Sequence, residues 1–204
     1  MRIDDGVRSL MLVPFVAIVA LAPLAIAASD APLASCAITF TGTSSLHDFE
    51  GTMPAVSATL QQASTDRWNS EVVVPVSSMT TDNGSRDAKM RDMLNAERFP
   101  DIRATFRDID PRTARDAHTL AGSLTIAGTT HEFTAKLENW QEQGSRISFD
   151  AASDVSLSNF GLVAPSVLGL VRVGDVVAVR AHVSVEAGDA VKALAVPQSA
   201  PTAP

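Results

Sequence analysis

The fold is decided by residues 80–106, TTDNGSRDAKMRDMLNAERFPDIRATF, where a short helix is inserted between two strands. The Asp-Asn-Gly turn at 82–84 tolerates positive φ and can cap a helix. Pro100 forces Phe99 out of the helical region, so the helix must end before it. Helical spacing puts apolar residues on one face (Met90, Met93, Leu94) and charged residues on the other (Arg86, Asp87, Lys89, Arg91, Asp92). We therefore expect a helix over about 84–95.

Alternation of apolar and polar residues, the pattern of a half-buried strand, surrounds this helix. It begins at Ile102 directly after the helix, and it recurs at 38–40, 72–76, 119–126, 132–138, 147–151 and 177–185. Short alternating segments joined by Gly, Asn and Asp are typical of an antiparallel sandwich or barrel. A barrel of about eight strands can enclose one small apolar ligand, whereas a sandwich is filled by its own side chains. Periodicity alone leaves both architectures open.

The first 27 residues have the pattern of a secretory signal peptide. Residues 10–28 carry no charge, Arg2 and Arg8 precede them, and Ala25-Ile26-Ala27 is a small-x-small cleavage site. We expect export and cleavage after Ala27, or one residue later. The alternative is that the apolar run stays uncleaved and spans a membrane.

The remaining chain divides into a short leader (28–35), a single β domain (36–187) and an Ala- and Pro-rich tail (188–204) that we expect to be disordered. Cys36 is the one cysteine, so no intramolecular disulfide can form. Its context, Leu-Ala-Ser-Cys, matches a lipoprotein box by residue type, but a strand pattern begins at once and leaves no tether. We expect an unlipidated cysteine that behaves as a small hydrophobe.

Charge and motifs exclude several classes of function. The net charge is −7 and basic residues do not cluster, which argues against nucleic acid and against polybasic attachment to anionic lipid. The sequence lacks the spacings of a zinc site, a nucleophile elbow, a P-loop or a dinucleotide fingerprint. His47-Asp48 and His131-Glu132 are sequence neighbours whose side chains point apart on a strand. We expect no enzymatic activity, no metal and no cofactor.

Four segments in order resemble the YceI-like family, exported bacterial proteins with lipocalin-like barrels that bind polyisoprenoid lipids. They are the block at 80–106, GSLTIAGTT at 122–130, SNFGL at 158–162 and RVGDVV at 172–177. The resemblance implies an all-β fold, an antiparallel lipocalin-like barrel of about eight strands with the helix inserted. It also implies a periplasmic location, and the family is often dimeric.

The resemblance further implies a long isoprenoid, or a similar amphipathic lipid, held in an apolar tunnel without chemistry. Candidate tunnel residues are Phe49, Val74, Met79, Met90, Met93, Leu94, Phe99, Phe106, Leu124, Phe133, Phe149 and Phe160. Candidate head-group residues are His47, Arg86 and Arg91, with Arg98 close by. Core packing and a solvated helix face are the alternative roles for these residues. The alternative function is a ligand-free β domain acting as a stress-related or accessory interaction protein. Transient membrane contact would accompany lipid transfer.

Overall fold

The computed structural model describes residues 31–54, 56–64, 66–144, 146–167 and 171–186; the expected signal peptide and tail lie outside them. The sheet contains β1 (Ala31–Ser44), β2 (Phe49–Met53), β3 (Ser57–Ser64), β4 (Arg67–Pro75), β5 (Asp101–Ile109), β6 (Thr119–Ile126), β7 (Thr129–Gln143), β8 (Arg146–Ser156), β9 (Ser166–Val167) and β10 (Val171–Glu186). The helices are α1 (Gly84–Met93) and α2 (Pro111–Ala117), with short 3-10 turns at Val76–Ser78 and Leu157–Phe160.

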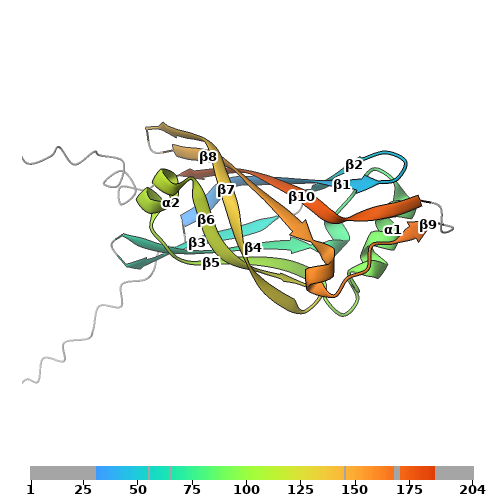
Figure 1. Cartoon of the computed structure of the whole chain (residues 1–204). Helices are drawn as coiled ribbons and strands as arrows, with labels where there is room; N and C mark the ends of the chain where they lie inside the picture. The colour runs from blue at the N-terminus through green and yellow to red at the C-terminus, as the bar shows by residue number, and fades with distance from the viewer. Residues whose placement is uncertain (1–30, 55, 65, 145, 168–170, 187–204) are drawn as a thin grey trace, which may run out of the picture.

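The sheet closes into an antiparallel barrel because β1 pairs with β10 as well as with β2 and β3 (Figure 1). β2 and β3 occupy one strand position, since Ile38 pairs with Met53 and Ala31 pairs with Leu60 in the same register. Pro54, which has no amide hydrogen for the ladder, lies between them. Eight strand positions therefore surround the axis, and the expected antiparallel barrel of about eight strands is confirmed.

The two helices lie at opposite ends of the barrel (Figure 1). The α1 end also holds the β1–β2 loop and the start of β10, which are joined where the Ser45 amide donates to the Arg172 carbonyl at 2.9 Å. Thr80, four residues before α1, exchanges backbone hydrogen bonds with Thr52 of β2. This bridge attaches α1 to the side of the barrel where β2 would otherwise be an edge.

The bounds of α1 confirm the helix expected over about 84–95, but the expected charged face was wrong at Asp87. Asn83 caps the helix by accepting from the Arg86 amide. Asp87 is only 7% exposed, because it precedes Met90 by three positions and shares its helix face. Its carboxylate accepts from the Thr80 hydroxyl (2.9 Å), the Thr81 amide (2.8 Å) and the Thr81 hydroxyl (2.6 Å). These donors replace the water that a buried carboxylate loses.

The sequence analysis did not predict α2, although its start carries a recognisable signal. The Asp110 carboxylate accepts from the amides of Arg112 and Thr113, and Pro111 occupies the first turn. The helix ends at His118, which adopts the left-handed conformation with φ of 54°. Seven residues are too few for a clear apolar period, so the cap and the proline were the only local indications.

The first strand begins earlier than expected. β1 starts at Ala31, inside the expected leader, and Cys36 is therefore the sixth residue of the strand, where it pairs with Val183. Within the described residues, no helix is both long enough and apolar enough to cross a membrane.

Candidate functional site

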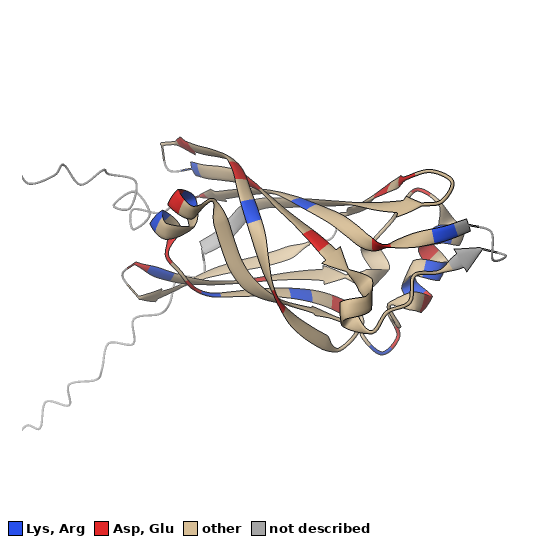
Figure 2. Ribbon diagram, viewed as in Figure 1, with Lys and Arg blue, Asp and Glu red and all other residues tan. Residues whose placement is uncertain are grey.

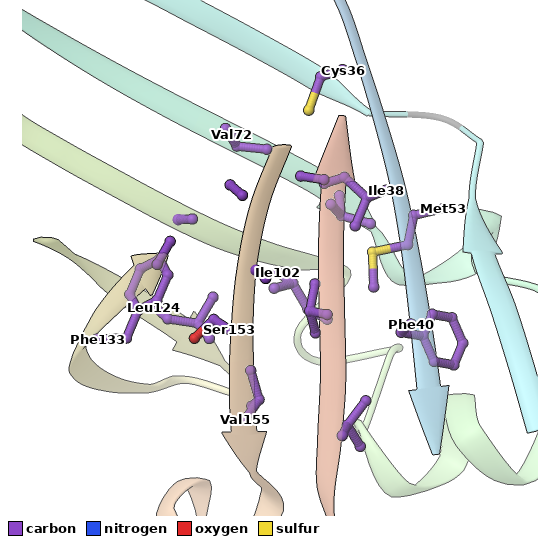
Figure 3. A pocket seen from close by; sticks show the side chains of 18 of the residues that line it. Cys36, Ile38, Phe40, Met53, Val72, Ile102, Leu124, Phe133, Ser153 and Val155 are labelled. Carbon is purple, nitrogen blue, oxygen red and sulfur yellow. The ribbon is translucent and has the colours of Figure 1, made fainter. Parts of the chain in front are cut away.

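A cavity of about 670 Å³ runs inside the barrel and is lined mainly by apolar side chains. Alternate residues of a strand point inward, so each strand contributes every second side chain. On β10 these are Val173, Val177, Val179, Ala181, Val183 and Val185. Figure 3 shows residues from distant strands, such as Ile38, Ile102, Leu124 and Val155, around one space.

Small inward side chains keep the centre of the barrel open. Ala181 of β10 pairs with Ala151 of β8 and with Ile38 of β1, and all three line the cavity. Ala104 and Ala135 line it from β5 and β7. The methyl groups of these alanines leave interior space that larger residues would fill as a core.

The cavity is polar only in part, and its charged lining lies at the α1 end. Arg86 and Lys89 of α1 contribute to the lining there, together with His47, Asn83 and Ser85. We call these five residues the basic rim. Among the described lining residues no carboxylate occurs. Elsewhere along the ribbon, acidic and basic positions are scattered among one another (Figure 2), and the chain as a whole carries a net charge of −7.

Packing and hydrogen bonds hold the basic rim in place. The Arg86 guanidinium lies 4.7 Å from the centre of the Phe49 ring, a cation–π contact that joins α1 to β2. The β1–β2 loop is tightened by the Ser44 hydroxyl, which donates to the His47 carbonyl at 2.6 Å. His47 and Arg86 thus reach the cavity lining from two different elements, the β1–β2 loop and α1.

The α2 end of the cavity is apolar. Pro111 and Ala114 of α2 lie there with Trp68, Trp140 and their neighbours Leu60, Ile109, Leu120 and Ile147. Trp140 stacks on Phe149 with ring centres 5.1 Å apart and planes 10° apart. A ligand in this cavity therefore meets hydrocarbon and indole at one end and cationic groups at the other.

The structure places ten of the twelve candidate tunnel residues along the cavity: Phe49, Val74, Met79, Met90, Met93, Leu94, Phe106, Leu124, Phe133 and Phe149. Phe99 and Phe160 do not belong to the lining. The Phe99 ring packs against Gly128 and lies under Arg98, with the Arg98 guanidinium 5.1 Å from the ring centre. Phe160 is buried and contacts the His131 ring edge-on at 5.2 Å.

Of the candidate head-group residues, His47 and Arg86 line the cavity, whereas Arg91 and Arg98 do not. Sequence reasoning missed Lys89, although its three-residue spacing from Arg86 puts both on neighbouring positions of the helix surface. It also missed both tryptophans, because the alternation was recognised only over 72–76 and 132–138, and Trp68 and Trp140 lie outside these ranges.

Cys36 lines the cavity from β1 and behaves as part of its apolar wall. Burial raises the pKa of the Cys36 thiol, so it stays protonated and weakly nucleophilic at neutral pH. In the described part of the chain, no group of three or more His, Cys, Asp or Glu side chains is arranged to hold a metal ion. The pair formed by His182 Nδ1 and Asp150 Oδ1, 2.7 Å apart, lies on exposed side chains outside the lining.

A closed antiparallel barrel around an apolar cavity defines a lipocalin-like protein. The YceI-like domain model matches residues 31–185, and the chain belongs to this family. A UPF0312 protein of Yersinia enterocolitica is 27% identical over 125 residues, which cover 58% of this chain and 62% of the relative. The chain thus spans less than two thirds of that relative.

Solved structures share the fold at low sequence identity. BcnA of Burkholderia cenocepacia aligns with a TM-score of 0.62 and 18% identity, over 76% of this chain and 99% of its own. A polyisoprenoid binding domain from Saccharophagus degradans aligns with a TM-score of 0.56 and 13% identity, over 78% and 98%. The Campylobacter jejuni YCEI protein aligns with a TM-score of 0.51 and 20% identity, over 68% and 85%.

Proposed function

We propose that this protein is exported and carries or sequesters a long isoprenoid, or a similar amphipathic lipid, by burial and without chemistry. The observation that carries the proposal is the apolar cavity of about 670 Å³ with a basic rim at one end. Removing lipid surface from water contributes roughly 25 cal/mol per Å² of apolar area, so an apolar tunnel suffices for binding. The polyisoprenoid-binding neighbour from Saccharophagus degradans supports the choice of an isoprenoid.

Side chains along the cavity suit a flexible ligand. Met79, Met90 and Met93 lie beside one another on the segment that contains α1, and all three line the cavity. The unbranched thioether side chain of Met adapts to irregular shapes, which favours a mobile lipid chain. No carboxylate accompanies them in the described lining, so His47 has no acidic partner there, which supports binding rather than catalysis.

The signal-peptide pattern of residues 1–27 supports a periplasmic location. The Cys36 side chain faces the cavity from within a strand, which favours an unlipidated protein. Leu46, 72% exposed at the α1 end, would touch a membrane briefly while lipid passes the basic rim. Homodimer formation stays a prediction from the family resemblance.

Native mass spectrometry of protein purified from the periplasm, beside an organic extract, tests the proposal. We expect a bound species whose extract shows the mass ladder of prenyl units. Loading empty protein with a polyprenyl lipid should also raise its melting temperature, because a ligand of the native state stabilises it. Protein that is empty, and stays empty after incubation with isoprenoids, quinones and fatty amides, would support the ligand-free interaction module instead.

The basic rim is expected to favour anionic lipids. The double variant R86Q/K89Q should bind geranylgeranyl phosphate about tenfold more weakly, since a charge-assisted contact contributes on the order of 1.5 kcal/mol. Its affinity for uncharged geranylgeraniol should not change. The matched control is K136Q/R180Q, which removes two exposed cations outside the cavity lining. Equal affinities of both double variants for geranylgeranyl phosphate would show that the basic rim does not attract the anionic group of the lipid.

A further inference from the structure

The indole N–H of Trp68 has no hydrogen-bond partner. Among the residues that the structure describes, this is the only buried side-chain nitrogen or oxygen without a hydrogen-bond partner. Trp68 is only 6% exposed. Buried tryptophans usually find a partner for this group. Leaving a buried donor unpaired is unfavourable, so an acceptor that reaches the Trp68 indole N–H would form a stabilising hydrogen bond.

The hydrophobic residues packed against Trp68 cannot accept its hydrogen bond. Leu60, Ile109 and Ile147 pack against the indole, and all three are hydrocarbon. The same three residues line the cavity, with Pro111 and Ala114 of α2 beside them at this end. Because Trp68 itself lines the cavity, a ligand held there can bring an acceptor to the indole.

Trp140 provides an internal comparison, because it also lines the α2 end of the cavity. Its indole N–H donates to the Glu142 carboxylate at 2.9 Å and is satisfied by the protein. The chain contains two tryptophans: the indole N–H of Trp140 donates a hydrogen bond, and that of Trp68 does not. Of the two indole N–H groups at this end, Trp68 therefore has the one that is free to bond to a ligand.

We propose that Trp68 determines specificity by donating a hydrogen bond to an uncharged acceptor oxygen, such as a ketone or quinone carbonyl, on a lipid that enters with this group leading. The inference rests on the proposed function and names a class of cargo. An indole N–H only donates, so the partner must accept. An anionic group is excluded at this end, because the described lining there holds no cation and an unpaired buried charge is far more unfavourable than a carbonyl.

The two ends of the cavity then select different lipids. The basic rim holds an anionic group while the tail points inward. Trp68 takes a neutral polar group while the tail points toward the rim. A few polar groups in an otherwise apolar pocket set the orientation of a ligand in this way.

The test compares W68F with W140F for two lipids of equal chain length: geranylgeranylacetone, which carries a ketone, and the corresponding hydrocarbon without it. Affinity is measured by displacement of N-phenyl-1-naphthylamine from the cavity. We expect W68F to lose about five- to tenfold more affinity for the ketone than for the hydrocarbon, the effect of one hydrogen bond. W140F also alters the cavity wall, but it should keep the wild-type ratio of the two affinities. An equal loss for both lipids in W68F would overturn the inference and leave Trp68 as a packing residue.

Fluorescence gives a second readout that leaves Trp68 intact. With no tyrosine and two tryptophans in the chain, W140F emits from Trp68 alone. Donating a hydrogen bond shifts indole emission to longer wavelength, so the ketone should shift the W140F spectrum and the hydrocarbon should not. Identical spectra with both lipids would contradict the hydrogen bond. If the wild type binds neither lipid, the proposed function fails as a whole, an outcome distinct from a failure of Trp68 alone.

Discussion

Replacing Ala181 by phenylalanine should weaken lipid binding about a hundredfold while the barrel stays folded. Ala181 lines the cavity between Ile38 and Ala151 on the neighbouring strands, and its small side chain occupies little of the interior. A phenyl ring there would occupy space that the lipid needs. Excluding about 110 Å² of apolar lipid surface at about 25 cal/mol per Å² weakens binding by about 2.7 kcal/mol, or about a hundredfold.

The matched control for A181F is A178F. Ala178 is on the same strand, three positions earlier, but its side chain is exposed and does not line the cavity. Both variants introduce the same ring, so only its position inside or outside the barrel differs. Binding is measured by displacement of the same fluorophore, and folding by circular dichroism. Wild-type affinity in folded A181F would show that the lipid does not occupy the centre of the barrel.

Replacing Asp87 by asparagine should lower the free energy of unfolding by about 1.5–3 kcal/mol at neutral pH, the range for hydrogen bonds to a charged group. The buried carboxylate accepts three hydrogen bonds from Thr80 and Thr81, and these join α1 to the segment that bridges to β2. An amide keeps one acceptor oxygen and adds an NH2 group facing donors. Urea denaturation measures the loss, with D92N on the exposed side of α1 as control.

The same variant should change the acid dependence of stability. Burial by itself raises the pKa of Asp87, but the hydrogen bonds from Thr81 and Thr80 and the charge of Arg91 outweigh it, so the pKa lies below its ordinary value of 3.8. A carboxyl group whose pKa is lowered on folding stabilises the protein above its unfolded pKa and loses this contribution as the pH falls through its folded pKa. D87N should therefore lose less stability than the wild type below about pH 4.

Other carboxylates keep part of the acid dependence in both proteins. The pKa of Asp150 is lowered by hydrogen bonds with Asn139 and His182, and that of Asp175 by hydrogen bonds with Ser156 and Ser158. The prediction therefore concerns the difference between D87N and the wild type. Parallel stability curves for the two proteins from pH 7 to pH 3 would contradict it, as would an equal loss in D92N.

Local sequence patterns predicted most of the secondary structure. The alternation at 102–107 and 177–185 predicted strands that the structure contains, the turn at 82–84 marked the start of α1, and α1 ends before Pro100 as expected. Assigning faces within α1 was less successful, because Asp87 is charged yet lies on the buried side. Its burial depends on donors supplied by Thr80 and Thr81, and hydropathy does not record where such partners lie.

The sequence predicted most of the apolar residues that line the cavity, but it did not predict all of their positions in the fold. The structure brings ten of the candidate apolar residues to one cavity, while Phe99 and Phe160 pack elsewhere. Lys89 and Trp68 were missed because membership of a barrel interior depends on which strands close the ring. Contact between any of these residues and a ligand stays a prediction.

By itself, the sequence determined a helix between strands, a succession of half-buried strands and the family to which they belong, because strand and helix periods are local properties. Only the tertiary structure decided that β1 meets β10, that β2 and β3 share one position, and that the enclosed space is hollow. Ring closure brings Ala151 and Ala181 together and puts a basic rim at one end of the cavity and Trp68 at the other. Contacts between distant strands depend on how the whole chain packs, and no local period specifies them.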